Sequence, residues 1–208
     1  MHAQESSSPE SSSSDSPVGT CPPAVALLAT RRSLKPDELA GPGPSPEELD
    51  TLLTIASRVP DHGKLAPWRF VVFEGDARLV AGEAIAAAFV TRYPRSDAGQ
   101  IEFEKRRFTR APLVVAVVSR AAPHVKIPEW EQVLSSGAAA MNLVVAANAL
   151  GFGAAWLTEW YAYDRGVLDA FGLAPHERIA GFVHVGRRTR APEDRVRPAL
   201  ADVVTRFA

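Results

Sequence analysis

Apolar residues recur at helical spacing in several parts of the chain, and this spacing predicts the helices. The clearest case is residues 46–58, where Ser45 and Glu48 can form a capping box and Pro46 takes the first helical position. The stripe that this helix would bury consists of Leu49, Leu52, Leu53 and Ala56. By the same criteria, further helices are predicted over residues 24–30, 76–90, 97–108, 128–150 and 164–171.

Continuous apolar runs predict four strands. They cover residues 70–73, 111–119, 153–158 and 179–185, and the run at 70–73 is expected to be buried on both faces. Because helices separate most of these strands, we expect crossover connections rather than hairpins. The predicted class is therefore α+β (α/β), with a central mixed sheet of about four to five strands flanked by helices.

The longest predicted helix, residues 128–150, has only small residues in its middle. The run from Ser135 to Ala140 contains serine, glycine and alanine alone, so another helix could approach it closely. A dimer interface is one use of such a surface. The chain ends in an amphipathic segment, residues 201–207, that is too short to be stable alone and is expected to pack on another part of the protein.

Composition limits the class of protein. The chain has 208 residues, 46% of them apolar, and a formal net charge of −1, which does not suggest a nucleic-acid binder. Residues 1–22 form a Ser- and Pro-rich tail that is expected to be disordered, and residues 23–208 are expected to form one domain. The single cysteine, Cys21, excludes an intramolecular disulfide. Since neither a secretory signal nor a membrane span is recognisable, a cytoplasmic location is expected.

The candidate chemistry is cationic. The chain has no metal-binding signature, no G-x-S-x-G elbow, no Walker loop and no G-x-G-x-x-G fingerprint. Its basic residues form three clusters: Arg31 and Arg32 with Ser33 and Lys35, then Arg58, His62 and Lys64 around the irregular loop 58–70, then Arg195 and Arg197. These clusters could converge on one anionic ligand, or they could be separate solvated surfaces. For the loop in particular, the alternative is a solvated connector that its prolines merely shape.

Three motifs in the chain resemble those of the nitroreductase family of FMN enzymes. They are Arg31-Arg32-Ser33 after the first helix, the segment Arg58-x-Pro-Asp-His-x-x-x-x-Pro-Trp-x-Phe70, and Gly151-Phe-Gly-x-x-Trp156. The Pro-Asp-His sequence in the loop and Pro128-Glu-Trp-Glu131 before the long helix are similar to the YdjA-like subgroup of that family. The likeness runs from about residue 24 to the end of the chain.

The resemblance implies a homodimer with a domain-swapped C-terminal segment and an FMN site at each subunit interface. The residues that it implicates in FMN binding are Arg31, Arg32, Ser33, Lys35, Arg58, His62, Lys64, Trp156, Leu157, Thr158, Arg195 and Arg197. The arginines would hold the phosphate, Trp156 to Thr158 would lie against the isoalloxazine ring, and Lys35 would lie near flavin N1. Guanidinium groups suit phosphate, and a cation near N1 stabilises the reduced flavin.

The implied activity is that of an FMN-dependent NAD(P)H oxidoreductase. NADH or NADPH would deliver hydride to flavin N5, and a nitroaromatic, a quinone or a similar small molecule would then take it in a ping-pong cycle. No side chain is expected to act as a catalytic acid or base. The resemblance also assigns the nicotinamide cofactor to Ala146, Ala147, Asn148, Ala149, Leu150 and Gly151, although a helix C-terminus is the wrong end of the dipole for a pyrophosphate.

Two alternatives to this activity are left open. One is a flavin-dependent dehalogenase or a flavin-fragmenting enzyme on the same fold, since fold does not fix reaction. The other is a flavin-binding protein without turnover. The role of Glu159, which follows the strand predicted to face the flavin, is also left open.

Overall fold

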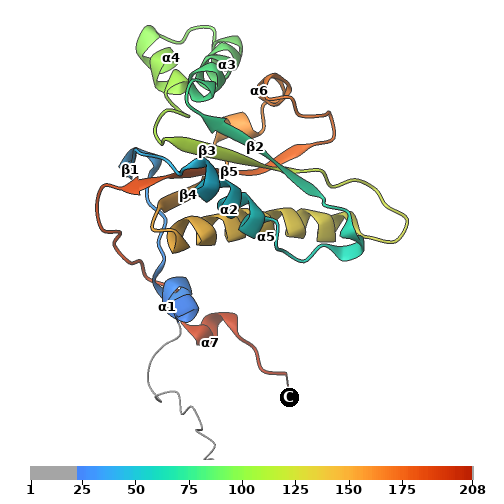
Figure 1. Cartoon of the computed structure of the whole chain (residues 1–208). Helices are drawn as coiled ribbons and strands as arrows, with labels where there is room; N and C mark the ends of the chain where they lie inside the picture. The colour runs from blue at the N-terminus through green and yellow to red at the C-terminus, as the bar shows by residue number, and fades with distance from the viewer. Residues whose placement is uncertain (1–22, 208) are drawn as a thin grey trace, which may run out of the picture.

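A five-stranded sheet forms the centre of the computed structural model, which describes residues 23–207 (Figure 1). Its strands are β1 (Leu39–Ala40), β2 (Trp68–Glu74), β3 (Leu113–Ser119), β4 (Gly153–Leu157) and β5 (Arg178–Arg188). They are arranged in the order β1-β5-β3-β2, and β4 also pairs with β5. Because β3 and β4 pair with overlapping parts of β5, these two strands lie on its opposite edges.

Every strand pair in the described chain is antiparallel, so the expectation of a mixed sheet was wrong in this respect. The long helical connections are responsible. They are long enough to return the chain in either direction, so connection length alone does not determine the direction of pairing. The α+β class and the five-strand sheet agree with the prediction. The short β1 lies where we expected only an extended connector.

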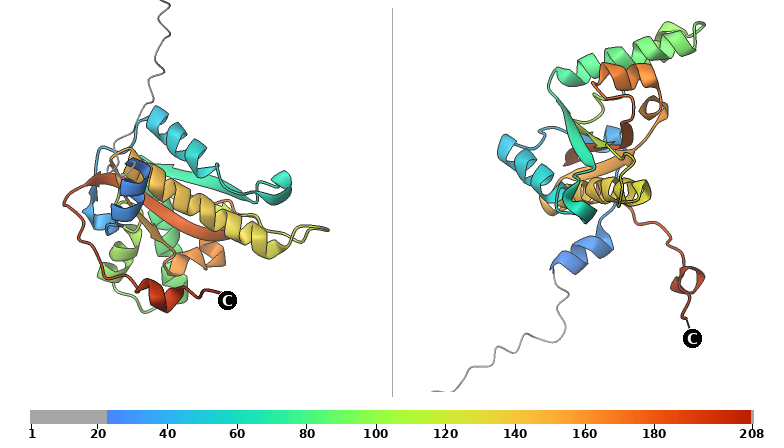
Figure 2. Two further views of the ribbon diagram at one scale, coloured as in Figure 1. Left: turned by 90° about the horizontal axis from the view of Figure 1, so that it is seen from below. Right: turned by 90° about the vertical axis from the view of Figure 1, so that its right-hand side faces the viewer.

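Helices cover both faces of the sheet, as the two rotated views show (Figure 2). The α-helices are α1 (Pro23–Thr30), α2 (Pro46–Ala56), α3 (Ala77–Arg92), α4 (Ala98–Lys105), α5 (Glu129–Ala149), α6 (Arg165–Ala170) and α7 (Leu200–Val203). Three short 3-10 helices are η1 (Pro36–Glu38), η2 (His62–Lys64) and η3 (Trp160–Ala162). The predicted capping box of α2 is present: the Ser45 hydroxyl accepts from the Glu48 backbone, and the Glu48 carboxylate accepts from the Ser45 N–H.

The two faces of the sheet have separate hydrophobic cores. Helices α2 and α5 cover one face, where Leu52 and Leu143 pack against Val115 and Val183. Helices α3 and α6 cover the other, which is rich in aromatic residues such as Phe108 and Phe182. Strand β3 is buried along its whole length, as a central strand should be. Strand β2 is only partly buried, contrary to prediction, because it lies at the end of the strand order.

The small residues of α5 contact their own chain. The Ser135 hydroxyl donates to the Pro60 carbonyl and the Ser136 hydroxyl to the Pro67 carbonyl, at 2.6 and 3.0 Å. Ala139 and Ala140 are fully buried in the core beneath the sheet. Small side chains thus bring α5 close to the sheet and to the loop after α2. A dimer contact through this run stays a prediction.

The two ends of the described chain project from the main body. Figure 1 shows α1 and α7 below α5, away from the sheet. The apolar side chains of this C-terminal segment are exposed, among them Val204 and Phe207, so the expectation that residues 201–207 pack on something is not met within one chain. A four-residue helix buries too little surface to stabilise its own packing against the rest of the chain. The predicted tail, residues 1–22, lies outside the described residues.

Candidate functional site

A cavity of about 400 Å³ opens where β4 ends beside α5. It brings together two of the three motifs singled out in the sequence, because Arg31 and Ser33 line one side and Trp156, Leu157 and Thr158 another. Met141, Val144 and Ala180 complete the wall. A backbone hydrogen bond of 3.3 Å from Leu34 to the Ala154 carbonyl ties the segment after α1 to β4, which explains how such distant residues meet.

Trp156 forms the aromatic wall of this cavity and is held by the neighbouring strand. Its indole Nε1 donates to the Ala180 carbonyl at 3.1 Å, and 38% of the residue remains exposed. The indole lies so close to β5 that a Cβ on Gly181 would come within 1.8 Å of the indole nitrogen. On the other side, a Cβ on Gly137 would meet the ring at 4.0 Å, an ordinary contact. Only glycine at position 181 therefore permits this orientation of Trp156.

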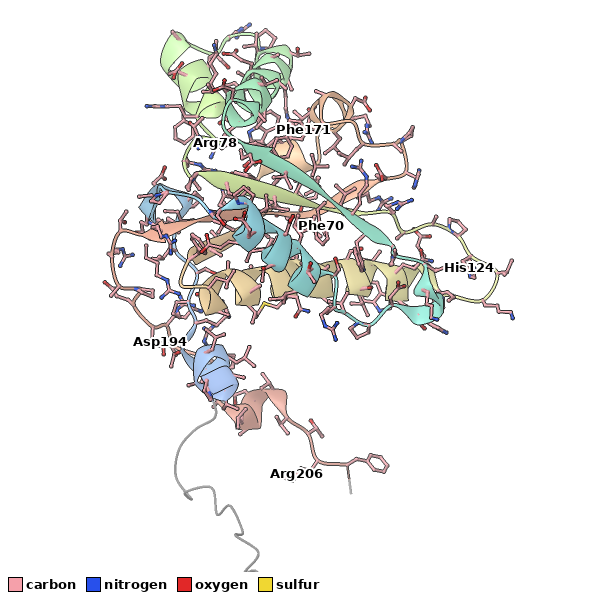
Figure 3. All side chains as sticks on the ribbon, in the orientation of Figure 1. Phe70, Arg78, His124, Phe171, Asp194 and Arg206 are labelled. Atoms are coloured by element: carbon pink, nitrogen blue, oxygen red, sulfur yellow. The ribbon has the colours of Figure 1, made fainter. Side chains whose placement is uncertain are left out.

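Arg31 forms the cationic end of the cavity, and two further arginines lie near it. Burial, followed by the nearby charges of Arg197 and Arg32, lowers the pKa of Arg31 below its ordinary value. Arg32 donates to the Glu193 carbonyl at 3.0 Å and lies 3.7 Å from the carboxylate of Asp194, which is labelled in Figure 3. The C-terminal segment thus places Arg197 near Arg31 and Arg32. Mutually repelling guanidinium groups at the edge of a cavity favour a bound anion.

The loop that carries Arg58, His62 and Lys64 lies elsewhere in the same chain. His62 is held near the start of α5, where its Nδ1 lies 2.7 Å from a carboxylate oxygen of Glu131. From Glu131 to Val144 in the cavity wall, α5 rises about 20 Å, at about 1.5 Å per residue. The exposed side chains of Arg58 and Lys64 belong to the same loop. The Arg58 carbonyl lies nearer the cavity, because it accepts a hydrogen bond from the Asn142 amide at 2.9 Å, but none of the three basic side chains lines the cavity.

The loop itself has a defined structure. The Asp61 carboxylate accepts hydrogen bonds from the backbone of Leu65 and Ala66, at 3.0 and 2.9 Å. Gly63, Lys64 and Ala66 all have positive φ angles, and a Cβ on Gly63 would come within 2.3 Å of Ile127. A turn with this backbone is held in one shape by its own hydrogen bonds. Asp61 is therefore a structural residue of the loop.

Lys35 and Arg195 are both exposed, and each donates a hydrogen bond through its backbone N–H. The Lys35 N–H donates to the Glu38 carboxylate at 2.9 Å at the start of η1. The Arg195 N–H donates to the side chain of Asp194 at 2.8 Å. Neither side chain lines the cavity. Their predicted contacts with flavin stay predictions.

The segment predicted for the nicotinamide cofactor forms the C-terminal cap of α5. Gly151 takes the left-handed conformation, with φ of 82°, and the Phe152 N–H returns to the Ala147 carbonyl at 2.8 Å. Ala146, Ala147 and Asn148 are buried, and the Asn148 side chain accepts a hydrogen bond from Arg188 at 2.9 Å. Ala149, Leu150 and Gly151 are more accessible. A nicotinamide contact here stays a prediction.

Glu159 points away from the cavity, which answers a question that the sequence left open. Its carboxylate forms ion pairs with Arg107 and Arg110 at 2.7 and 2.6 Å and accepts a hydrogen bond from the Tyr161 hydroxyl. Burial is the main cause that raises the pKa of Tyr161, with the charge of Glu159 second. These contacts lie on the sheet face that carries α3 and α6. Glu159 is therefore an anchor of the chain after β4.

Sequence reasoning missed four residues that shape the cavity: Met141, Val144, Ala180 and Gly181. Met141 and Val144 are three positions apart on α5, so helical periodicity could have placed both on one face. Nothing local marks Ala180 or Gly181. Their importance comes from the close approach of Trp156 across two strands, which is a tertiary feature.

Comparisons with known proteins point in one direction. A model of the nitroreductase family matches residues 28–187. The chain is 36% identical over 168 residues to the Escherichia coli protein named "Putative NAD(P)H nitroreductase YdjA", covering 78% of this chain and 87% of that protein. Its structure is similar to that of a nitroreductase-like protein from Bacillus cereus, with a TM-score of 0.79, 22% identity and coverage of 92% and 99% of the two chains. It is also similar to a Desulfovibrio desulfuricans protein titled a "putative nitroreductase in complex with FMN", with a TM-score of 0.70, 24% identity and coverage of 91% and 99%.

Proposed function

The chain belongs to the nitroreductase family, and we propose that it is an FMN-dependent NAD(P)H oxidoreductase that reduces a nitroaromatic, a quinone or a similar small acceptor in a ping-pong cycle. The observation that carries this proposal is the cavity itself, which has arginine at one end and an exposed indole at the other. The names of the relatives agree, because one is described as an NAD(P)H nitroreductase and another was solved with FMN. A cytoplasmic location remains a prediction.

The residues of the cavity fit the chemistry of FMN. Arg31, with Arg32 and Arg197 nearby, would hold the phosphate, because guanidinium groups bind phosphate oxygens through charge-assisted hydrogen bonds. Ser33 offers a hydroxyl at the same end, and Thr158 offers one at the end of β4. Trp156 and Leu157 would form the wall for the flavin ring. When bound, FMN would supply hydride transfer between the nicotinamide and the acceptor.

A second copy of the chain would supply the remaining predicted contacts. None of Arg58, His62 and Lys64 is among the residues that line the cavity of their own chain, and His62 is held near the start of α5. We therefore propose that they contact the flavin held by a partner, in a homodimer with two interface sites. The exposed face of α5, which includes Trp130 and Leu134, offers an apolar surface for such a contact.

The substrates would use one open position in turn. The cavity is lined by few polar groups, and among its eight lining residues no acid is available to protonate a substrate. The chain's role in the chemistry would then be to bind, orient and partly cover the flavin. This arrangement suits flat acceptors that can stack on an exposed ring.

Visible spectroscopy tests the proposal. The purified protein, supplemented with FMN if it is colourless, should hold flavin through gel filtration. Under anaerobic conditions NADH or NADPH should bleach the bound flavin, and a quinone or nitroaromatic should then restore its colour. A protein that retains no flavin, or whose flavin is bleached no faster than free FMN, would overturn the proposal. Restored colour with release of halide from a halogenated phenol would instead favour a dehalogenase.

A further inference from the structure

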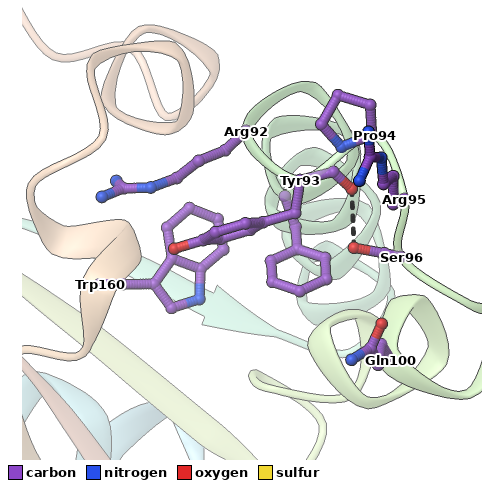
Figure 4. Close-up of a pocket in the computed structure, with 8 residues that line it drawn as sticks. Arg92, Tyr93, Pro94, Arg95, Ser96, Gln100 and Trp160 are labelled. Carbon is purple, nitrogen blue, oxygen red and sulfur yellow. Dashed lines mark hydrogen bonds between the residues drawn. The ribbon is translucent and has the colours of Figure 1, made fainter.

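A second and larger cavity, of about 660 Å³, lies on the opposite face of the sheet (Figure 4). It opens between the end of α3, the start of α4 and η3. Its size is in the range of small-molecule sites. It is lined by Phe89, Arg92, Tyr93, Pro94, Arg95, Ser96, Gln100 and Trp160. None of these residues belongs to the proposed flavin site.

Three aromatic rings form the apolar part of this cavity. The ring of Phe89 lies 5.0 Å from that of Tyr93 and 5.8 Å from that of Trp160, measured between centroids, with tilted planes. The Trp160 indole is fixed because its Nε1 donates to the Glu104 carboxylate at 2.9 Å. Rings at these distances leave faces and edges on which a further planar ring can pack.

The polar part of the cavity is cationic. Figure 4 shows the side chains of Arg92 and Tyr93 extending from α3 toward Trp160, and the Arg92 guanidinium lies 5.7 Å from the Tyr93 ring. Neither Arg92 nor Arg95 forms an ion pair with any residue between 23 and 207. The lining contains no acidic side chain. The two guanidinium groups are therefore available to an anionic ligand.

The loop between the two helices is held by its own hydrogen bonds. The Ser96 hydroxyl and backbone N–H both donate to the Tyr93 carbonyl, at 2.7 and 3.0 Å. Asp97 and Gln100 then form a capping box at the start of α4. A pre-formed site loses less entropy when a ligand binds.

We propose that this cavity is a second binding site, which takes a planar aromatic molecule carrying a carboxylate or sulfonate group. The ring would pack among Phe89, Tyr93 and Trp160, and the anionic group would pair with Arg92 or Arg95. The site is linked to the first cavity through a short piece of chain. Thr158 lines the first cavity, Glu159 anchors the turn, and Trp160 lines the second.

Nuclear magnetic resonance can test both the binding and its location. The chain has four tryptophans, and the indole N–H signal of Trp160 is identified as the one lost in a Trp160→Phe variant. Titration of the purified protein with 2-naphthoate should shift this signal saturably. The Trp156 signal, assigned in the same way, should stay unchanged. Saturating FMN should not displace the naphthoate, because the two cavities lie on opposite faces of the sheet.

Matched ligands and variants test the chemistry. The neutral 2-naphthalenemethanol has the same rings without the charge and should bind more weakly. Arg92→Gln or Arg95→Gln should weaken naphthoate binding by about two- to fivefold, the effect of an exposed charge pair. Either change should leave binding of the neutral ligand nearly unaltered. Arg178→Gln serves as a control, because Arg178 is an exposed arginine that lines a different cavity.

Three outcomes would overturn the proposal. The first is the absence of saturable binding of naphthoate. The second is a shift of the Trp156 signal, or displacement by FMN, either of which would move the ligand to the first cavity. The third is weaker naphthoate binding in the Arg178→Gln variant together with unchanged binding in the Arg92 and Arg95 variants. The binding of naphthoate, the Trp156 signal and the arginine variants can all be read whether or not the protein proves to be an FMN oxidoreductase.

Discussion

Trp156 is the side chain on which the shape of the proposed flavin cavity most depends. It is partly exposed, yet a hydrogen bond to the Ala180 carbonyl and the absence of a side chain at Gly181 fix its orientation. The tryptophan could be singled out from the sequence because of the motif that contains it. Its supports could not, since the residues that hold it are distant along the chain and carry no signal of their own.

We predict that Gly181→Ala moves the Trp156 indole and weakens flavin binding. The added methyl would overlap the indole nitrogen, and overpacking of this kind costs about 1–3 kcal/mol of stability. FMN affinity should fall by about three- to tenfold if an aromatic contact is lost. Fluorescence titration measures the affinity. Gly137→Ala is the matched control, because its methyl would meet the same ring at an ordinary distance. Equal affinities of both variants would contradict the assignment.

His184 carries a second prediction at this scale. It is fully buried on β5, and neither ring nitrogen has a hydrogen-bond partner within residues 23–207. Burial, helped by the positive charge of Arg110, lowers the pKa of His184 to about 3. In the unfolded chain the pKa of this histidine is near 6.5, so the unfolded state binds the proton more readily. The contribution of the neutral His184 to stability is therefore fully present well above pH 6.5, and it is lost as the pH falls from there toward the folded pKa.

Between pH 6.5 and pH 5 this histidine alone should reduce the free energy of unfolding by about 1.6 kcal/mol. We predict that His184→Phe removes this pH dependence of the free energy of unfolding, because phenylalanine does not titrate and keeps an aromatic ring beside Phe108. Urea unfolding at both pH values measures the difference. A variant with the wild-type slope would show that the histidine is not kept neutral by burial.

At the scale of elements, the turn from β4 into η3 separates the two cavities. Glu159 anchors it through ion pairs with Arg107 and Arg110, whose side chains are each only 15% exposed. The sequence placed Glu159 after a strand that faces the flavin but could not tell to which side it points. The direction depends on arginines about fifty residues earlier in the chain, which no local pattern connects to it.

We predict that Glu159→Gln destabilises the protein by about 1–3 kcal/mol, because the largely buried Arg110 loses its charged partner and Arg107 keeps only its ion pair with Glu104. Urea unfolding measures this loss. Glu83→Gln is a matched control, since Glu83 is 66% exposed in its pair with Lys105 and its loss should change stability very little. If the two variants were equally stable, the turn would not depend on this anchor.

The elements themselves were largely predictable. Every predicted helix and strand has a counterpart, because capping residues and apolar periodicity act locally. The direction of strand pairing was not predictable, and neither was the exposure of β2. Both depend on how the elements assemble rather than on any segment alone. The same holds for the cavity, whose two motifs are linked by a hydrogen bond between Leu34 and Ala154.

At the scale of the whole molecule, the described chain leaves surfaces that suit a partner. Leu200, Val203 and Val204 are exposed on the projecting C-terminal segment, which also carries Arg197. Exposed apolar residues on a segment held by few contacts often mark an interface. None of the helices within residues 23–207 is long and apolar enough to cross a membrane. The swapped segment and the homodimer remain predictions.

We predict that removal of residues 191–208 converts a dimer to a monomer and releases FMN. The deletion takes away both the apolar segment and the arginines at 195 and 197. A Leu200→Ser and Val203→Ser double variant separates the two effects, because it keeps both arginines and alters only the apolar contact. Analytical ultracentrifugation with flavin absorbance measures both properties. A truncated protein that stays dimeric with full flavin would contradict the swapped arrangement.

The measurement that tests the central claim most directly compares FMN with riboflavin, which lacks the phosphate. Both flavins are titrated by fluorescence into the wild type, into Arg31→Ala and into Arg178→Ala as a control for an exposed arginine. If Arg31 binds the phosphate, its removal should weaken FMN binding by about 10- to 100-fold, the effect of losing hydrogen bonds to a charged group. Riboflavin should bind all three proteins equally. An Arg31→Ala protein that keeps the wild-type preference for FMN over riboflavin would contradict the proposed site.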